Sequence, residues 1–545
     1  MSGWRSPDGR PYVALAVPRA LAQCCVPEVA LHNADSGACA GSRAGNEQKV
    51  QMKATTAQRP SQVTTIVSRW LFYVVLIAGT AWRISLVFTP VFSPDSDRAV
   101  VYLMARHAAQ GDFSALYWGQ SYGGTALPIT AGLVMHITGM NIETLAIVGI
   151  GYWAAAAWFT RAVAREMISP VAGDIAGVLV WLPAMGVVLQ SILDPGFYGP
   201  TLAFALSAVW LIVRGERQKP LWQWALIGVL AGLAFWQSAV GGALVAPFLV
   251  WQALGQRRWR SWGVGAVAIV VGCAPWIKAA VLEGVGVFAP HGRQLPLRSA
   301  YTLYTHVLPA SFHASPAGSD VFRLGVAGLA FALMASFTAV AIAQRRWPRV
   351  LFVVSLALVT VALVVGSGTV LLWDSYRYAS FLFPTLAIAG AWLLTSWRPG
   401  IPFGIVFAVG AAVAFSVPTV SASRPGLGSL QAERWGADTL AVGDFLRDRH
   451  ANTAMGDYWF AYRFTASQNE SIRVGSLVLD RFPPYSQAAK SARPGFVVVQ
   501  AGGANDKLIA AINPPGATRT VIVDWAVYEL PDGYSSLGSP AWALF

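Results

Sequence analysis

The sequence predicts an all-α polytopic membrane protein with a small α/β domain at its C-terminal end. Of its 545 residues, 55% are hydrophobic and 12% are charged, and the mean hydropathy is +0.50. Soluble domains carry about 25% charged residues, so a chain of this composition must place much of its surface in lipid. After Val420 the composition changes, and helix and strand patterns typical of a soluble domain follow.

The basic residues are distributed as in a multi-pass membrane protein. The formal net charge of +13 is concentrated in short clusters between apolar runs, for example at 214–219, 256–260 and 344–349. Cytoplasmic loops carry this excess of Lys and Arg, whereas a nucleic-acid-binding protein gathers basic residues on one domain surface. We therefore expect a protein of the plasma (cytoplasmic) membrane, with the lipid bilayer as a partner and no nucleic acid.

Residues 1–63 are predicted to form a disordered, cytoplasmic N-terminal tail. Its first part mixes Gly, Ala, Arg, Pro and Ser without periodicity, and the apolar patch YVALAV is too short for a signal sequence. Met52 begins a short basic segment and is an alternative start of the functional protein. The 4 cysteines show no metal-ligand spacing and suggest no disulfide framework.

Residues 64–421 are predicted to form the transmembrane module, because an apolar run of about 20 residues spans the bilayer as a helix. With the basic loops assigned to the cytoplasm, the charge rule predicts about eleven full spans, and up to about thirteen. The short run at 124–140 contains His136 and is expected to be re-entrant or partial. The candidate runs lie near 66–91, 124–140, 142–162, 171–192, 196–213, 221–236, 239–255, 261–281, 322–343, 349–370, 378–397 and 401–420.

The loops at 93–123 and 282–321 are predicted to face outward, and an odd number of spans from an inside N-terminus also places 428–545 outside. This extracytoplasmic domain is predicted to be α/β. Residues 430–449 show the periodicity of an amphipathic helix. The segments GFVVVQAG and TRTVIVDWAVYEL are rich in β-branched residues, as strands are.

The first outer loop, 93–123, carries two acids directly after the first span. Acids near membrane depth are costly and mark candidate functional sites, although Asp95 and Asp97 also suit a solvated helix end. The residues that follow have the pattern of a short amphipathic helix that ends at Gly111 and suits the membrane interface. A carboxylate there is suited to act as general base on a hydroxyl that attacks a sugar on a lipid phosphate. A cation would stabilise the departing phosphate.

This loop resembles the first outer loop of the GT-C superfamily of polyprenyl-phosphate-sugar glycosyltransferases, in particular the protein O-mannosyltransferase and lipid A aminoarabinose transferase type. The matching residues are an acid, then RAVVYLMARHAAQG, then YWGQSYGG. The resemblance implies that Asp97 is the catalytic base, with Asp95 as its neighbour. The chain departs from the family in Arg98, where Glu is common, and in GGTALP, where a Glu often precedes the next helix. The missing Glu leaves open any metal or sugar contact that it would make.

The segment LLWDSYRYASFLFP resembles the family's Arg-Tyr signature at the outer mouth of a late span. The resemblance implies that Arg377, with Tyr378, binds the donor phosphate, since the planar donor fork of Arg suits phosphate. Asp374 would orient Arg377 or contact the substrate. An Arg that snorkels at the interface is the structural alternative.

Further residues are expected to contact the substrate, and each has a structural alternative. Asp194 and Tyr198 lie at a predicted outer hairpin tip, where Asp-Pro-Gly also makes a turn unaided. Trp236 and Gln237 lie at another outer tip, where Trp also belongs to the aromatic belt. In the C-terminal domain, Asp457, Tyr458 and Arg463 are candidates for acceptor contact, although such residues also belong to the core or surface of a small sheet. The remaining expected contacts lie in the first outer loop and are Tyr117, Trp118, Gln120 and Tyr122.

These features predict a membrane glycosyltransferase. It would move a hexosyl or pentosyl group, with inversion, from a polyprenyl-phosphate sugar to a cell-envelope acceptor (lipid, glycan or protein) on the outer face. No nucleotide-binding signature such as G-x-x-x-x-G-K-[ST] is present, which fits a lipid-linked donor. No metal site is predicted from spacing, although a divalent cation is compatible with the chemistry. The alternatives are a transporter or flippase of envelope lipids and a non-catalytic envelope scaffold of the same fold.

Overall fold

The computed structural model describes residues 62–537, which belong to one compact unit, Pro60–Phe545, apart from several gaps. Nearly all of the predicted tail, with Met52, and of the predicted span 401–420 therefore lies outside the described residues, as do parts of the loop 282–321. The side chain of Asp374 lies outside them too. The gaps are residues 121 and 257 and the stretches 183–184, 216–217, 283–295, 313–319, 367–372 and 397–429, in the last of which residue 406 alone is described.

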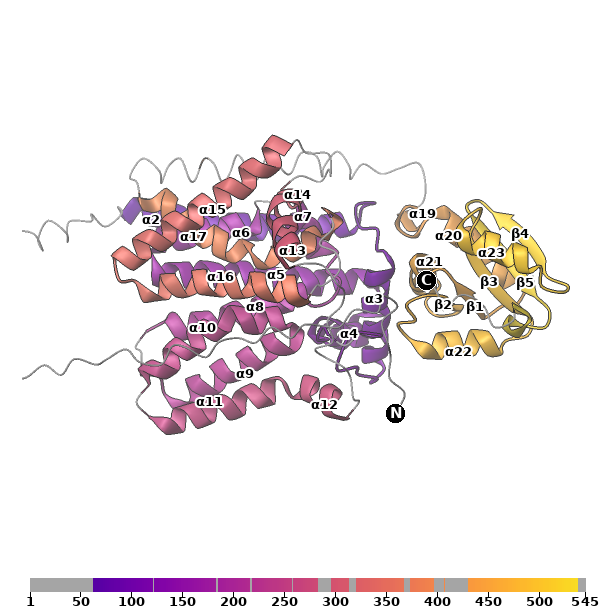
Figure 1. Ribbon diagram of the computed structural model, residues 1–545, viewed down its shortest axis with the longest axis horizontal. Coiled ribbons are helices and arrows are strands. Elements are labelled where there is room, and N and C mark those ends of the chain that lie inside the picture. Colours follow the sequence, from indigo (N-terminus) through magenta and orange to yellow (C-terminus); the bar gives the residue numbers. More distant parts are fainter. Residues whose placement is uncertain are drawn as a thin grey trace, which may run out of the picture. The chain divides into compact units, whose positions relative to one another are not determined.

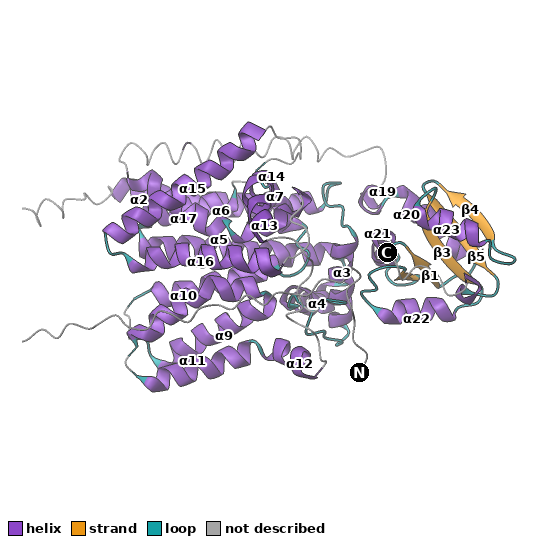
Figure 2. Ribbon diagram, viewed as in Figure 1, coloured by secondary structure: helices purple, strands orange, loops and turns teal. Residues whose placement is uncertain are grey.

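The described residues are mostly helical, and their strands all lie in the C-terminal region (Figures 1 and 2). This arrangement confirms the predicted combination of a helical part and a small sheet region. The helical elements before that region are α2 (Gln62–Val87), α3 (Ser96–Ala109), α4 (Ala126–Thr138), α5 (Ile142–Met167), α6 (Pro170–Trp181), α7 (Met185–Ile192), α8 (Tyr198–Val213), α9 (Leu221–Gln237), α10 (Ala239–Gly255), α11 (Trp259–Gly272), α12 (Ala274–Leu282), α13 (Pro296–Thr302), η1 (Leu303–Val307), α14 (Leu308–Ala310), α15 (Asp320–Ala343), α16 (Trp347–Gly366), η2 (Trp373–Phe381) and α17 (Phe383–Ser396).

Among the described helices, 4 are long and apolar enough to cross a membrane, namely α2, α5, α15 and α16. Two bent pairs, α6 with α7 at 73° and α11 with α12 at 63°, raise that number to 6 if each pair is one span. Shorter apolar helices of 10–17 residues are α4, α8, α9, α10 and α17. These helices support a multi-pass membrane protein, whereas the total of about eleven spans stays a prediction from the loop charges.

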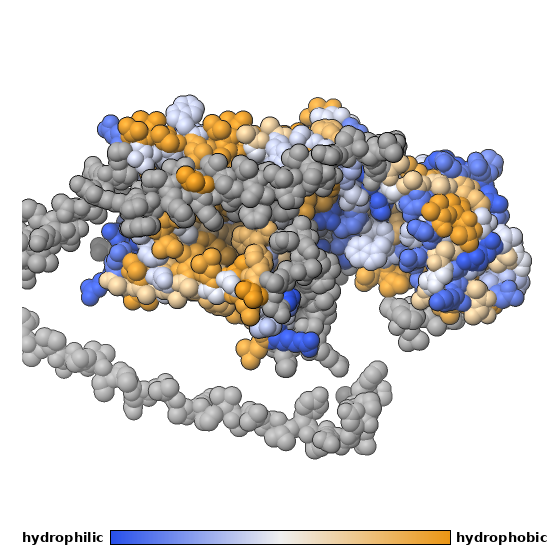
Figure 3. Space-filling model, turned by 90° about the horizontal axis from the view of Figure 1, so that it is seen from above, coloured by the Kyte–Doolittle hydropathy of each residue, from blue (hydrophilic) through white to orange (hydrophobic). Residues whose placement is uncertain are grey.

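The surface of the helical part is rich in large apolar side chains, as a surface that faces lipid requires. Ile77, Val267, Leu329 and Val361 are each more than half exposed. In Figure 3, hydrophobic residues cover much of the visible helical part, whereas hydrophilic residues gather on the region that contains the sheet. The exposed apolar surface thus belongs to the part of the chain that was predicted to lie in the membrane.

Basic residues near the end of α5 and the start of α16 meet at one end of the helices. Arg349 Nε, at the start of α16, donates to the carbonyl oxygen of Met167 at the end of α5, at 3.2 Å. Near the same end of α5, Arg161 and Arg165 share the buried carboxylate of Asp174, at 2.7 Å and 3.2 Å. The α5–α6 and α15–α16 connections therefore lie at the same end of the bundle, as the charge rule requires.

The C-terminal region contains a five-stranded mixed sheet with the strand order β2-β1-β3-β5-β4. β2, β1 and β3 run parallel, while β5 is antiparallel to both β3 and β4. The predicted strands correspond to β3 and to the β4–β5 hairpin. The predicted helix at 430–449 is interrupted at Gly436, whose φ of +91° suits glycine. The elements are α19 (Leu430–Trp435), α20 (Ala437–Asp448), β1 (Thr453–Gly456), α21 (Tyr458–Ser467), β2 (Arg473–Ser476), α22 (Pro483–Ser491), β3 (Gly495–Gln500), α23 (Ala504–Ile512), β4 (Thr518–Ile522), β5 (Trp525–Leu530) and η3 (Tyr534–Leu537).

α3 is buried rather than laid on an open membrane interface, which corrects the expectation for this helix. Of its 14 residues, Ser96, Ala108, Ala109 and all those from Ala99 to Arg106 are buried. The helix packs against α4 of the helical part and against α21 of the C-terminal domain. The apolar residues of α3 and α21 belong to one hydrophobic cluster. The amphipathic pattern therefore reflects contact with two protein neighbours.

Candidate active site

Asp95 and Asp97 hold different places at the start of α3. Asp95 is the N-cap, and its side chain accepts a hydrogen bond from the backbone N–H of Arg98 at 3.0 Å. This bond satisfies one of the free donors of the first helical turn. The Arg98 guanidinium pairs with the same carboxylate and donates to the carbonyl oxygen of Leu193. Asp95 thus shapes the end of the helix, whereas Asp97 lines a cavity.

The Asp97 carboxylate is contacted by two guanidinium groups and a phenol. Arg377 Nη1 lies 3.5 Å from Oδ2, and Arg481 Nη2 lies 3.7 Å from Oδ1. The hydroxyl of Tyr458 donates to Oδ1, and that of Tyr117 donates to the Asp97 carbonyl oxygen at 2.6 Å. Hydrogen bonds between charged N–H and carboxylate groups are about 2.7–2.9 Å long. Neither guanidinium is therefore tightly bonded to Asp97.

The cavity beside Asp97 brings together residues from four separate segments of the chain. Its volume is about 30 Å³, and roughly 10–15 Å³ suffices for one water molecule, so it holds a few waters at most. A larger ligand therefore requires side chains at its mouth to move. Of the 9 lining residues, all but Pro195 and Phe197 were predicted from the sequence as site residues. The lining residues are Asp97, Tyr117, Gln120, Tyr122, Pro195, Phe197, Tyr198, Arg377 and Tyr378.

Aromatic rings form one wall of the cavity. The Tyr198 ring stacks on Phe197 at a centroid distance of 4.6 Å and on Phe381 at 5.2 Å. Burial raises the pKa of Tyr117 and of Tyr122 above the ordinary value of 10.0, so both phenols stay neutral hydrogen-bond donors. A wall of aromatic faces and hydroxyl groups suits a ligand with both apolar and polar faces, such as a sugar.

Arg377 has a donor that is not used. Its Nε atom is buried and has no hydrogen-bond partner among the described residues. Most buried polar atoms in proteins are hydrogen-bonded, so an unpaired guanidinium N–H beside a cavity is a donor available to an anionic ligand.

Asp194, predicted to contact the substrate, closes a buried turn. Its Oδ1 accepts from the backbone N–H of Gly196 at 2.9 Å. Its Oδ2 accepts from the backbone N–H of Gly199 and from Trp153 Nε1, both at 2.8 Å. The geometry therefore favours the turn alternative for this residue.

Trp236 and Gln237 hold the first outer loop in place. Trp236 Nε1 donates to the carbonyl oxygen of Ala115 at 2.7 Å. Gln237 Oε1 accepts from the backbone N–H of Ala126 at 3.2 Å. The Gln237 carbonyl oxygen accepts from the backbone N–H of Gly124 at 3.0 Å. These bonds tether both ends of the loop segment that lines the cavity.

The C-terminal domain supplies two residues to the site. Tyr458 is the first residue of α21, and its carbonyl oxygen accepts a hydrogen bond from Ser96 Oγ at 2.7 Å. Arg481 lies between β2 and α22 and faces Gln120. With the Gln120 amide turned to satisfy both groups, its oxygen accepts from Arg481 Nη1 at 2.7 Å and from Nη2 at 3.0 Å. Sequence reasoning missed Arg481 because it stands outside every motif and reaches the site only through docking of the domain.

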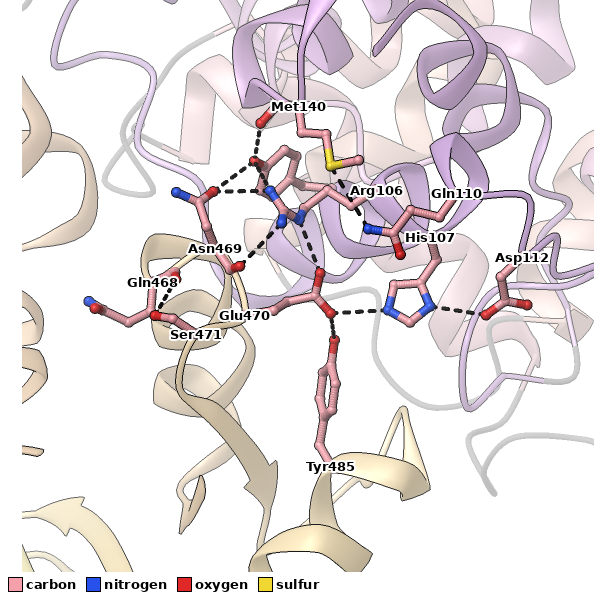
Figure 4. Close-up of polar contacts among 11 residues, drawn as sticks. Arg106, His107, Gln110, Asp112, Met140, Gln468, Asn469, Glu470, Ser471 and Tyr485 are labelled. Atoms are coloured by element: carbon pink, nitrogen blue, oxygen red, sulfur yellow. Dashed lines mark hydrogen bonds and ion pairs between the residues drawn. The ribbon is translucent and has the colours of Figure 1, made fainter. Parts of the chain in front are cut away.

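A polar network docks the C-terminal domain on α3 (Figure 4). Glu470 Oε2 lies 3.0 Å from Arg106 Nε, and Oε1 lies 3.0 Å from His107 Nε2. The hydroxyl of Tyr485 donates to Oε1 at 2.5 Å. Burial alone would raise the pKa of Glu470, but hydrogen bonds from these three side chains outweigh it and lower the pKa from 4.5 to about 2. We call Arg106, His107, Glu470 and Tyr485 the docking cluster.

Trp118, predicted to contact the substrate, packs in the same interface. Its ring stacks on Phe482 at 4.0 Å with an interplanar angle of 20°, and it meets the His107 ring edge-on at 4.9 Å. Phe482 directly follows Arg481, so this stack supports the segment that enters the site.

The residues around the cavity do not fit a divalent cation. Asp97 is the one carboxylate among the lining residues, and two guanidinium groups lie against it. A hard divalent cation takes several oxygen ligands and would be repelled by these groups. Across the described part of the chain, no group of three or more His, Cys, Asp or Glu side chains is placed to hold a metal ion. We therefore derive no step through a metal.

No protein-family model and no curated protein matches this sequence. Among solved structures, the chain is similar to ArnT from Cupriavidus metallidurans in the apo state, with a TM-score of 0.57 at 13% identity over 87% of this chain and 100% of that one. It is also similar to the Archaeoglobus fulgidus oligosaccharyltransferase with zinc and sulfate, with a TM-score of 0.48 at 13% identity over 84% of this chain and 73% of that one. ArnT is an aminoarabinose transferase of the GT-C class. The likeness to ArnT confirms the predicted GT-C resemblance at the level of the fold.

Proposed function

We propose that this chain is a membrane glycosyltransferase that moves a sugar from a lipid-linked phosphate donor to an acceptor hydroxyl. The observation that carries the proposal is the pairing of Asp97 with Arg377 at one cavity. The two residues are 280 positions apart in the sequence, and the fold around them is shared with ArnT. A general base and a cation for the leaving phosphate are the two groups that this reaction needs.

The two residues divide the chemistry between them. The acceptor oxygen forms a bond to the anomeric carbon while the bond from that carbon to the phosphate oxygen breaks. The hydroxyl proton passes to Asp97, and the bonding electron pair leaves with the phosphate. Attack from the face opposite the phosphate inverts the anomeric centre. Arg377 stabilises the negative charge that develops on the phosphate, because a guanidinium offers two parallel donors to it.

Tyr458 and Arg377 keep Asp97 ready for this step. The phenol donates to Oδ1 and holds the carboxylate plane, while Arg377 lies near Oδ2 at 3.5 Å. When a phosphate draws the guanidinium away, Oδ2 is free to accept the acceptor proton. The remaining polar groups of the cavity wall then bind sugar hydroxyls.

The donor that we assign is a polyprenyl phosphate carrying a hexose or pentose, and the acceptor is a hydroxyl of the cell envelope on the outer face. The motifs of the first outer loop and of the Arg-Tyr segment support this assignment through their resemblance to GT-C enzymes. The apolar exposed surface of the helical part supports a donor that arrives through the bilayer. A carrier lipid also needs no nucleotide-binding domain.

The test compares two carboxylates in one helical turn. Purified protein is given a panel of polyprenyl-phosphate sugars, and Asp97→Asn is measured against Asp95→Asn. Removal of a general base typically costs about 10²–10⁴-fold in rate, so Asp97→Asn should lose transfer while its melting transition shows that the protein is still folded. Asn caps a helix about as well as Asp, so Asp95→Asn should stay within a few-fold of wild type.

Retained transfer in Asp97→Asn would remove Asp97 from the role of base. A protein that carries labelled polyprenyl phosphate across a vesicle membrane, and forms no glycosylated product with any donor, would instead be a flippase. If cells that carry either variant keep a normal envelope, the result would favour the non-catalytic scaffold.

A further inference from the structure

We propose that Arg481 of the C-terminal domain is a second phosphate-binding residue, so that the donor phosphate is held between Arg481 and Arg377. The inference rests on the function proposed above and names a residue that no sequence motif marks. It makes docking of the C-terminal domain part of the donor site.

The geometry places one guanidinium at each oxygen of the Asp97 carboxylate. Arg377 Nη1 is 3.5 Å from Oδ2, and Arg481 Nη2 is 3.7 Å from Oδ1. The Arg481 side chain is only 13% exposed. A phosphate that binds next to this carboxylate would lie between the same two cations. The distances leave both groups free to turn toward such a ligand.

Arg481 is held at the site by both parts of the chain. Its backbone N–H donates to the Tyr462 hydroxyl at 2.6 Å, and its Nε donates to the Tyr458 hydroxyl at 3.3 Å. From the other side, the first outer loop approaches at Gly119, whose φ is +63°. A Cβ added at Gly119 would lie 2.7 Å from Arg481 Cα. Backbone therefore packs on backbone here, and the loop brings Gln120 onto the guanidinium.

The charges of the reaction balance with two arginines and not with one. A sugar phosphodiester carries one negative charge and ionised Asp97 carries another, which two guanidinium groups neutralise. After transfer, the phosphate monoester carries close to two negative charges, Asp97 is protonated, and the same two cations neutralise the product. With Arg377 alone, one negative charge would stay uncompensated at both stages in a largely buried site, which is costly. The cavity without a ligand keeps one excess positive charge that attracts the donor.

The test measures binding of undecaprenyl phosphate, with undecaprenol as the uncharged control, by the full chain in detergent micelles. The variants are Arg377→Gln, Arg481→Gln and Arg481→Lys, and the matched control is Arg473→Gln, an exposed residue of β2 in the same domain. A hydrogen bond to a charged group is worth enough for Arg481→Gln to weaken phosphate binding about 10-fold or more. Arg481→Lys should lose less affinity for the phosphate, because Lys keeps the positive charge but lacks the two parallel donors of Arg. Undecaprenol binding and Arg473→Gln should match wild type.

The outcomes separate the two proposals. If wild type does not prefer the phosphate over the alcohol, the proposed function fails. If Arg377→Gln loses the preference and Arg481→Gln keeps it, the second phosphate-binding residue is refuted while the proposed function stands. If Arg481→Gln and Arg481→Lys lower the melting temperature and the affinity for both lipids alike, Arg481 has a structural role and the inference is equally overturned.

Discussion

The two ends of α3 carry two carboxylate clusters that are built in opposite ways. At the C-terminal end, Glu470 of the docking cluster meets Arg106 and His107 at 3.0 Å each. At the N-terminal end, Asp97 lies 3.5 Å and 3.7 Å from its guanidinium partners. The docking cluster has its contacts at bonding distance, whereas the guanidinium contacts of Asp97 are longer and Arg377 has an unused donor. The difference indicates that one cluster holds a domain in place and the other awaits a ligand.

The turn that carries Glu470 of the docking cluster has a strained backbone. Asn469 and Glu470 have φ values of +50° and +66°, which residues other than glycine rarely adopt at a typical cost of about 1–3 kcal/mol each. The turn presents both residues to α3. Arg106 donates to the Asn469 side-chain oxygen at 3.1 Å and to its carbonyl oxygen at 3.2 Å. The bonds to α3 compensate for a conformation that the isolated turn would not favour.

The largest effect is expected from Glu470→Gln, which removes the charge of the Glu470 carboxylate and keeps the shape of the side chain. Breaking a buried ion pair from one side costs about 3–5 kcal/mol, and we expect the lower end because the Glu470 side chain is 17% exposed. Transfer should fall as well, because Tyr458 and Arg481 depend on the docked domain. Denaturant unfolding of the full chain measures the first effect, and transfer from a polyprenyl-phosphate sugar measures the second.

The matched control for that variant is Asp444→Asn, which removes a carboxylate 71% exposed and paired with Arg447. Exposed pairs are worth about 0–1 kcal/mol, so this variant should unfold as wild type does. Equal stability of Glu470→Gln and Asp444→Asn would contradict a docking role for the cluster.

A smaller effect is expected from Tyr458→Phe, which removes the phenol donor to Asp97 Oδ1. One hydrogen bond to a charged group is worth about 1.5–3 kcal/mol, so transfer should fall by about 10-fold or more while the domain stays docked. Turnover and the melting temperature should be measured side by side, with Tyr534→Phe in η3 as the control. A loss of melting temperature without a loss of turnover would place Tyr458 with the docking residues instead.

The smallest effect concerns pH. Burial alone lowers the pKa of His107, but hydrogen bonds with Glu470 and Asp112 outweigh it and raise the pKa above 6.5. A raised pKa in the folded state means that this stabilisation is complete below about pH 6.5 and is lost as the pH rises through the raised value. The melting temperature of wild type should therefore decline from mildly acidic to alkaline pH more than that of His107→Gln. Parallel pH profiles for the two proteins would show that His107 does not contribute.

Much of the helical part and of the cavity was predictable because its signals are local. Apolar runs mark helices that face lipid, and segments rich in β-branched residues marked β3, β4 and β5. β1 and β2 escaped prediction because each has 4 residues, too few for a pattern to stand out. Gly436 interrupts a helix that periodicity alone would continue.

Motifs pointed to most of the cavity residues, and two other candidates that do not line this cavity share one feature. Asp194 and Trp236 have the polar or aromatic character of a ligand contact, yet their hydrogen bonds go to neighbouring backbone and side-chain groups. Residue type alone does not distinguish a side chain that lines a cavity from one that closes a turn beside it. That distinction depends on which partners lie within bonding distance in the fold.

The sequence by itself determined the chemistry available to this protein: a carboxylate at the start of a short helix, an Arg-Tyr pair at a late outer segment, and a chain apolar enough for lipid. Only the tertiary structure decided which distant groups surround Asp97, among them Tyr458, which is 361 residues away and donates to its carboxylate. The reason is that helix and strand patterns arise from neighbours along the chain, whereas an ion pair between distant segments forms only after both are docked. Arg481 enters the site in this second way, through the contact between the C-terminal domain and α3.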